Sequence, residues 1–251
     1  MPDRRSHRGA HPDDARLFAP DVWPKLQIAV QDLCWLLDRG YSRPSALKLV
    51  GDRYALEKRQ RTAISRCACS KDALERRRHH RAEPSLLKQT SLWLDGYNVL
   101  TTIEAALAGG VILAARDGCY RDMASMHGSY RKVEETLPAL RILGELTAGW
   151  NLGELHWLLD RPVSNSGRLK GILLKIAAEY GWNWKVELVR NPDTLLIDTE
   201  NAVVTADSAI LDRCQSWINL ARLAITEQVP QAFLVDLSEE SPNATGYSVL
   251  R

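Results

Sequence analysis

Apolar residues recur every three to four positions over residues 25–81, which is the spacing of helices that bury one face. Gly40 and Gly51 interrupt the pattern, and a glycine at such a point commonly closes a helix. This part of the chain is therefore predicted to be all-helical. The expected helices span residues 25–39, 42–50, about 54–67 and 71–81.

From residue 91 onward, short apolar runs alternate with helical patterns. The alternation predicts an α/β fold in which a parallel sheet is sandwiched by helices. The expected strands span residues 91–97, 111–115, 154–159, 184–189, 202–204 and, at one edge, 231–235. The expected helices span residues 101–108, 130–147, 167–180 and 208–224.

These patterns divide the chain into four segments, with the main boundary at Glu83-Pro84-Ser85. They are a disordered N-terminus over residues 1–22, a small basic all-α domain over 23–83, an α/β domain over 91–236 and a loose polar tail over 237–251. No run approaches the roughly 18 consecutive apolar residues of a membrane span. The first residues also lack the apolar segment of a secretory signal.

Charge differs sharply between the two main segments, although the net charge is only +2. Residues 1–90 contain 19 Lys and Arg against 11 Asp and Glu, a net of +8, and residues 91–251 contain 14 against 20, a net of −6. A basic segment suits a polyanion, whereas an acidic one suits a bound cation. The five cysteines are scattered, which indicates a reducing compartment and hence a cytoplasmic location.

The basic helices have the outline of a helix-turn-helix, in which a short helix, a glycine turn and a basic helix follow one another. Arginine and lysine side chains on such a surface bind phosphates without regard to base sequence. The alternative is a helical docking domain whose basic face is merely exposed. The candidate nucleic-acid-binding residues are Arg53, Lys58, Arg59, Arg61, Arg76, Arg77 and Arg78.

Three apolar strands of the second segment each end in an aspartate: Asp95, Asp160 and Asp207. The carboxyl ends of parallel strands meet at one edge of a sheet, so these carboxylates are expected to converge, with Asn98 beside them. Such a cluster suits one or two Mg²⁺ or Mn²⁺ ions. The alternative is that each aspartate only caps the next helix. A further acidic ligand is expected from Glu104, Asp117 or Asp212.

Two polar loops offer further candidates for substrate binding. The first contains Arg121, His127, Ser129 and Arg131, which combine phosphate-binding arginines with a histidine that titrates near neutrality. The second follows Asp160 and is a candidate anion pocket. Its candidate residues are Arg161, Ser164 and Asn165. The alternative is that both loops are held by internal hydrogen bonds.

The Asp-Gly-Tyr-Asn strand, the Leu-Leu-Asp strand and the Thr-Ala-Asp strand together resemble the PIN-like superfamily and its NYN branch, over residues 91–225. The resemblance implies a PIN-like fold in which Asp95, Asp160 and Asp207 are the metal ligands of a nuclease and Asn98 orients the site. The whole chain is also similar to a prokaryotic family catalogued as domain of unknown function 434, in which a basic helical module precedes the PIN-like part.

The expected function is a Mg²⁺- or Mn²⁺-dependent nuclease that cleaves phosphodiester bonds. RNA is favoured over DNA as the partner because the resemblance points to ribonucleases. One alternative is a nucleic-acid-binding protein with a degenerate PIN-like scaffold and no catalysis. Another is a phosphotransfer enzyme that uses the loop around His127. No membrane partner is expected, and a homodimer is among the oligomeric states that the sequence leaves open.

Overall fold

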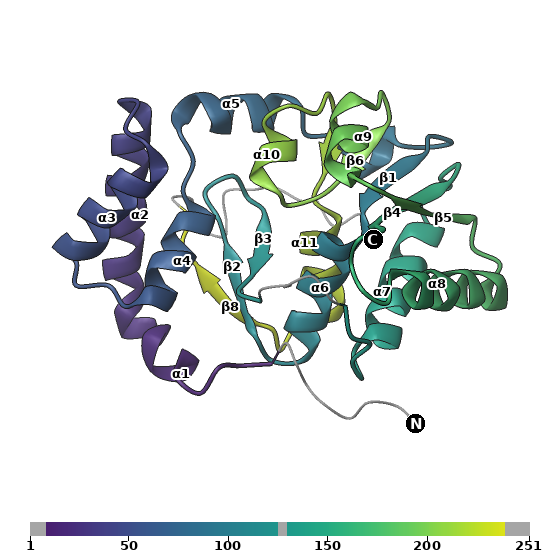
Figure 1. The fold of residues 1–251 in the computed structure, drawn as a ribbon, viewed down its shortest axis with the longest axis horizontal. Helices are drawn as coiled ribbons and strands as arrows, with labels where there is room; N and C mark the ends of the chain where they lie inside the picture. The colour runs from purple at the N-terminus through teal and green to yellow at the C-terminus, as the bar shows by residue number, and fades with distance from the viewer. Residues whose placement is uncertain (1–8, 125–129, 239–251) are drawn as a thin grey trace.

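Two β-sheets organise the protein, and a helical N-terminal part packs beside the smaller one (Figure 1). The structure is a computed structural model and describes residues 9–124 and 130–238. The N-terminal helices are α1 (Asp14–Leu17), α2 (Trp23–Asp38), α3 (Arg43–Arg53), α4 (Lys58–Cys67) and α5 (Lys71–His79), with a 3₁₀ turn at Pro20–Val22. Of these, α2 to α5 match the predicted helices closely.

The larger sheet has five strands in the order β5-β4-β1-β6-β7, and all neighbouring pairs are parallel. Its strands are β1 (Leu92–Asp95), β4 (Leu155–Asp160), β5 (Trp184–Val189), β6 (Ala202–Val204) and β7 (Trp217–Ile218). This sheet confirms the predicted parallel arrangement. Strand β1 lies at its centre, so that Asp95 reaches the carboxyl edge between the ends of β4 and β6.

The smaller sheet has the order β3-β2-β8 and corrects the prediction of a single parallel sheet. Its strands are β2 (Val111–Ala114), β3 (Tyr120–Asp122) and β8 (Phe233–Asp236). Strand β2 pairs antiparallel with β3 and parallel with β8. The sequence predicts β2 and β8, but it assigns both to the main sheet and does not predict β3.

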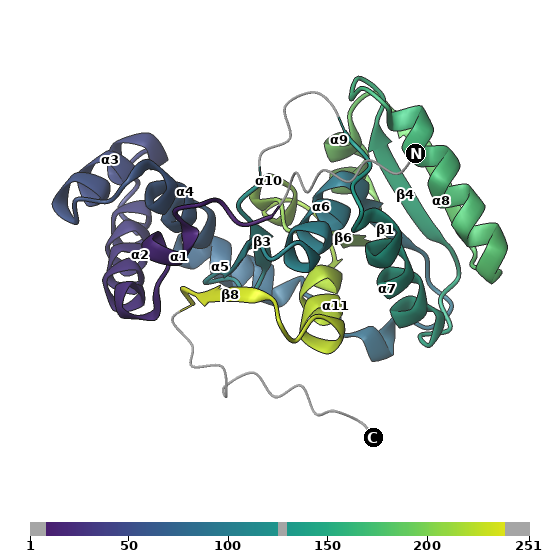
Figure 2. The same ribbon diagram turned by 90° about the horizontal axis from the view of Figure 1, so that it is seen from below.

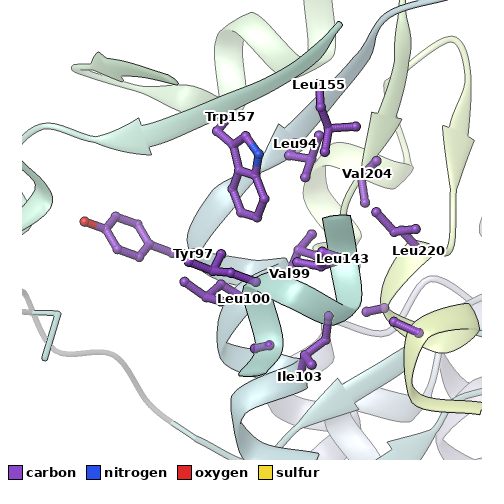
Figure 3. Packing of buried hydrophobic residues seen from close by; sticks show 14 of the residues in the cluster. Leu94, Tyr97, Val99, Leu100, Ile103, Leu143, Leu155, Trp157, Val204 and Leu220 are labelled. Carbon is purple, nitrogen blue, oxygen red and sulfur yellow. The ribbon is translucent and has the colours of Figure 1, made fainter. Parts of the chain in front are cut away.

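Helices cover both faces of the larger sheet, as predicted. They are α6 (Gly96–Leu107), α7 (Thr136–Ala148), α8 (Ser166–Tyr180), α9 (Pro192–Asp198), α10 (Ser208–Leu211) and α11 (Leu220–Gln228), and a 3₁₀ turn at Pro84–Leu86 precedes β1. Helices α6, α7, α8 and α11 share one hydrophobic core with one face of the sheet, part of which is drawn in Figure 3. Helices α9 and α10 pack on the opposite face.

The predicted helix over 208–224 is wrong, because the chain forms α10, β7 and α11 in this region. Trp217 pairs with Val203 as the last strand of the sheet. Asn219 then caps α11 by accepting a hydrogen bond from the backbone N–H of Arg222. A strand and a new cap therefore divide what the apolar spacing alone presents as one helix.

The helical N-terminal part shares a hydrophobic core with the smaller sheet. Side chains such as Leu26, Leu33 and Ile64 pack in one cluster with Leu113 of β2 and Val235 of β8. Figure 2 shows these helices beside β8 and β3, on the side away from α8. The all-α segment is thus joined to the α/β part through buried apolar contacts as well as through the chain.

Structure begins earlier than the sequence predicts. Residues 14–22, expected to be disordered, form α1 and the 3₁₀ turn, and Leu17 and Phe18 are buried. The burial of these two side chains in the shared core supplies the free energy that holds this segment. Residues 1–8 and 239–251 lie outside the described part of the chain. Within the described residues, no helix is long and apolar enough to cross a membrane.

Candidate functional site

The three predicted aspartates and two further aspartates line a single cavity at the carboxyl edge of the larger sheet. Asp95 ends β1, Asp160 ends β4 and Asp207 follows β6. The further two are Asp193, in the first turn of α9 after β5, and Asp122, the last residue of β3 in the smaller sheet. The cavity has a volume of about 590 Å³. The three strand-end carboxylates thus line one cavity, as the parallel pairing of their strands leads one to expect.

Asp95, Asp160, Asp193 and Asp207 form an acidic cluster, in which Asp95 is half-buried and its environment favours the neutral form. Burial raises the pKa of Asp95 to about 7, and repulsion from Asp207, Asp193 and Asp160 adds to the increase. A hydrogen bond from the Thr205 hydroxyl to Oδ2, of 2.8 Å, opposes it. A carboxyl group with this pKa exchanges its proton near neutral pH.

The other carboxylates are more open to solvent but are affected by the same field. Burial raises the pKa of Asp160, and the charge of Asp193 raises it further. Burial also raises the pKa of Asp193, with a contribution from Asp207. The four aspartates thus repel one another, which is the electrostatic condition that a bound cation or proton relieves.

Asp207 and Asn98 hold the surrounding backbone in place. The Oδ1 of Asp207 accepts a hydrogen bond of 2.7 Å from the backbone N–H of Ala209 and caps α10. The capping alternative is therefore correct for this residue, which also lines the cavity. Asn98 accepts a 2.9 Å hydrogen bond from the N–H of Ala206 and joins α6 to the loop after β6. It orients this loop beside the cluster, close to its expected role.

The donor set fits a hard divalent cation in its chemistry, since it consists of carboxylate oxygens. The arrangement of the side chains does not yet form a ligand shell: in the described part of the chain, no group of three or more His, Cys, Asp or Glu is placed to hold a metal ion. Cation binding would therefore require these aspartates to move closer together.

A buried hydroxyl without a partner lies in the same cavity. Tyr97 is only 3 % exposed, and its hydroxyl has no hydrogen-bond partner among the described residues. Figure 3 shows this oxygen pointing away from the surrounding apolar side chains. Burial and the nearby charge of Asp160 raise the pKa of Tyr97 to about 12, so that it stays a hydrogen-bond donor. A buried donor left unpaired costs free energy unless a ligand satisfies it.

Three arginines also line this cavity: Arg43 and Arg66 from the N-terminal helices and Arg121 from β3. The sequence analysis proposed only Arg121 for the site. Arg121 is buried, and its guanidinium is committed to a bidentate ion pair with Asp117, at 2.9 and 2.7 Å.

The candidates for an additional acidic ligand all lie elsewhere, which corrects that part of the prediction. Glu104 is fully buried and accepts hydrogen bonds of 2.6 Å from the hydroxyls of Tyr130 and Thr136. Asp117 and Asp212 both pair with Arg77. Each carboxylate therefore stabilises the fold.

The buried pair of Asp117 and Arg77 joins α5 to the α/β part. Burial alone would raise the pKa of Asp117, but the charges of Arg121 and Arg77 hold it well below its usual range. Arg77 is only 2 % exposed, so its prediction as a nucleic-acid-binding residue is wrong. Its charge forms ion pairs with Asp117 and Asp212.

Several other predicted nucleic-acid contacts are engaged in ion pairs. Arg59 pairs with the buried Asp14 and so neutralises its charge. Arg61 pairs with Asp52 at 2.9 Å. Arg53 lies 3.7 Å from Asp32. Lys58 is exposed at the start of α4, and Arg76 and Arg78 lie on α5. The helix-turn-helix interpretation stays a prediction for these exposed residues.

The two polar loops contribute little to the cavity. His127 and Ser129 lie outside the described residues. The Asn165 side chain donates a 2.9 Å hydrogen bond to the carbonyl of Tyr130. The backbone N–H of Tyr130 in turn donates to the Ser164 carbonyl. These bonds support the alternative that the loops are held by internal hydrogen bonds. Arg131 and Arg161 are exposed and do not line the cavity.

Cavity residues for which the sequence predicts no role include Asp193, Asp122, Tyr97 and Arg43. Asp193 carries the clearest signal, since it follows a predicted strand by four positions in Asn191-Pro192-Asp193. Asp207 follows its own strand at a similar distance. Tyr97 lies inside the quoted Asp-Gly-Tyr-Asn motif but was given no role.

The fold and the site define a class of protein: a mixed α/β protein with a helical N-terminal part and a cavity that is lined by both aspartates and arginines. The chain belongs to the family described as a domain of unknown function (DUF5616), which matches residues 84–223. Residues 25–80 match a second family, described as a protein of unknown function (DUF434). The expected similarity to the latter is thus confined to the helical part.

A relative from Methanocaldococcus jannaschii, described as uncharacterized protein MJ0935, is 30% identical over 186 residues. The match covers 74% of this chain and 88% of the relative, so it includes most of both proteins. No solved structure matches the chain.

Proposed function

We propose that the protein is a metal-dependent nuclease, with RNA as the favoured substrate, and that its C-terminal part is PIN-like. The observation that carries the proposal is the convergence of Asp95, Asp160, Asp193 and Asp207 in one cavity. The hydroxyl of Tyr97, which lines the same cavity and has no hydrogen-bond partner in the described part of the chain, is an independent indication that a ligand belongs there. The preference for RNA and the PIN-like assignment rest on the resemblance of the three aspartate-bearing strands.

The four aspartates would hold Mg²⁺ or Mn²⁺. A divalent cation in such a site supplies a more acidic bound water and neutralises charge on a phosphodiester as it reacts. Asp95 contributes a carboxyl group that ionises near pH 7, so the cluster gains its full negative charge only above that pH. Loss of protons on cation binding then makes the affinity for the cation increase with pH.

The surrounding residues would orient the substrate and the cluster. Thr205 fixes Asp95 through its hydroxyl, and Asn98 fixes the loop that leads to Asp207. The Tyr97 hydroxyl would donate a hydrogen bond to an oxygen of the substrate, since no protein group accepts it among the described residues. Arg43, which lines the same cavity, would face the phosphate backbone.

A second candidate is a nucleic-acid-binding protein without catalysis. It is favoured by one observation: no three acidic or other metal-binding side chains of the described chain are arranged as a ligand shell. In that case the aspartates would repel rather than assist a phosphodiester, and binding would depend on the basic residues alone.

Cleavage of a labelled RNA, with Mn²⁺ or with EDTA, separates these candidates. Asp193→Asn is expected to lower cleavage by at least about a hundredfold, because a single missing electrostatic contact to a transition state costs roughly this much. Asp198→Asn is the matched control, since Asp198 lies exposed at the other end of the same helix and does not line the cavity. It should retain the wild-type rate.

Cleavage by the wild type that persists in EDTA would refute the metal-dependent mechanism. Equal cleavage by wild type and Asp193→Asn after repurification would refute the assignment of the site. RNA binding without any cleavage by the wild type would establish the non-catalytic candidate.

A further inference from the structure

The three arginines that line the cavity differ in their ion pairs. Arg121 is paired with Asp117 at 2.7 Å, and Arg66 lies 3.7 Å from Asp122. For Arg43, no carboxylate lies within ion-pair distance among the described residues, although its side chain lines the same cavity as the four aspartates. Unlike Arg66 and Arg121, Arg43 thus has no neighbouring carboxylate in the described part of the chain to neutralise its charge. Its guanidinium is therefore available to an anionic ligand.

The side chain of Arg43 is held in place rather than loose. Arg43 is the first residue of α3, and its Nη1 donates to the carbonyls of Ser65 and Ala68, at 2.8 and 3.2 Å. These carbonyls belong to the C-terminal end of α4 and its cap. Because both bonds use Nη1, the N–H groups of Nε and Nη2 have no partner among the described residues and form a free donor edge.

The environment of Arg43 is unfavourable for a lone cation. Its side chain is half-buried, and burial together with the charge of Arg77 lowers the pKa of the guanidinium. A desolvated charge without a counter-ion is costly unless a ligand compensates it. A planar pair of N–H donors matches two oxygens of a phosphate group in geometry and charge.

We infer that Arg43 forms an anion subsite that binds a phosphate group of the nucleic-acid substrate. In this arrangement one phosphate lies beside the carboxylates and a neighbouring phosphate of the same strand lies at Arg43. The helical N-terminal part then completes the site rather than serving as a separate binding domain. The inference rests on the proposed nucleic-acid substrate but not on its cleavage.

The test is binding of a fluorescein-labelled 12-nucleotide oligouridylate to the full chain in EDTA, measured by fluorescence anisotropy at several salt concentrations. Arg43→Gln removes the charge but keeps amide donors for the two carbonyls. Arg39→Gln is the matched control, since Arg39 is an exposed arginine of the same helical part that stacks on Trp35 and does not line the cavity.

Arg43→Gln is expected to weaken binding at least fivefold and to reduce the slope of log K against log salt by about 0.7, the contribution of one phosphate contact on a single strand. Arg39→Gln should stay within about twofold of the wild type. Arg43→Lys, which keeps the charge but loses the planar donor pair, should fall between them and provides the comparison if the glutamine variant does not fold. Equal effects of Arg43→Gln and Arg39→Gln would overturn the subsite.

Inorganic pyrophosphate distinguishes this inference from the proposed function. If the wild type binds no RNA, the nucleic-acid substrate is wrong, and calorimetric titration with pyrophosphate then decides the subsite alone. Heat of binding that disappears in Arg43→Gln supports an anion subsite for another phosphate compound. Absence of binding by the wild type, or unchanged binding by the variant, overturns it.

Discussion

Replacing Asp95 with asparagine should stabilise the protein in a manner that depends on pH. The pKa of this carboxyl group is about 7 in the folded protein, against an ordinary value of 3.8. Asparagine keeps the shape of the side chain and an oxygen that accepts the hydrogen bond from Thr205. The variant therefore removes the half-buried charge with little other change.

The direction in which stability changes with pH depends on whether the folded or the unfolded chain keeps the Asp95 proton. Below pH 3.8 the carboxyl group is protonated in both the folded and the unfolded chain, so Asp95 does not affect the balance. As the pH increases towards 7, the unfolded chain ionises while the folded protein retains the proton, and the folded state loses stability. Above about pH 7 both states are ionised and the full cost remains.

The magnitude follows from the same pKa values. At about 1.4 kcal/mol per pH unit, ionising Asp95 costs the fold up to about 4 kcal/mol at pH 8, and about 1.5 kcal/mol at pH 5. The stability difference between Asp95→Asn and wild type should thus grow by about 2.5 kcal/mol between pH 5 and pH 8. Any constant effect of the substitution cancels in this comparison.

Urea denaturation at pH 5, 6, 7 and 8, with EDTA present, measures the difference. The exposed Glu179→Gln of α8 is the control, and its stability difference from wild type should stay constant. A difference for Asp95→Asn that changes by less than about 1 kcal/mol over this range would refute the raised pKa. It would also remove the electrostatic argument for a cation site.

Three further substitutions test the interior of the structure. Arg77→Met should lower the free energy of unfolding by about 3–5 kcal/mol, because it leaves Asp117 buried with one partner fewer, and a denaturation curve measures this loss. Tyr97→Phe should leave stability unchanged or raise it by about 1 kcal/mol, since it removes a buried hydroxyl that has no partner in the described part of the chain. Cleavage of RNA by this variant should fall. A loss of stability would indicate that the hydroxyl has a partner. Gly96→Ala should cost about 1–3 kcal/mol, because its Cβ would lie 2.8 Å from the Leu158 carbonyl oxygen, and a wild-type melting temperature would contradict this contact.

The parallel sheet and its acidic edge could be predicted because both depend on local signals. Apolar strands that end in aspartate are visible in the sequence, and parallel pairing places their ends together. The sequence does not mark Asp193 in this way, because Arg190-Asn191-Pro192 separates it from its strand and the short helix whose first turn contains it is not among the predicted helices. The prediction covers only aspartates that adjoin an apolar run.

Other parts of the site depend on packing that no local pattern reports. Glu104, Asp117 and Asp212 are as plausible as Asp193 in the sequence, and only their partners in space assign them to the fold. Arg43 reaches the cavity because the helical part packs on the smaller sheet through a shared core. That contact joins segments far apart in the chain.

The most direct test of the central claim is a crystal structure of the protein soaked in MnCl₂ at pH 8, with an anomalous difference map at the manganese edge. We expect a peak in the cavity within bonding distance of carboxylate oxygens of Asp95 and at least two of Asp160, Asp193 and Asp207. Manganese peaks that appear only elsewhere on the protein, with these aspartates still apart, would contradict a cation site.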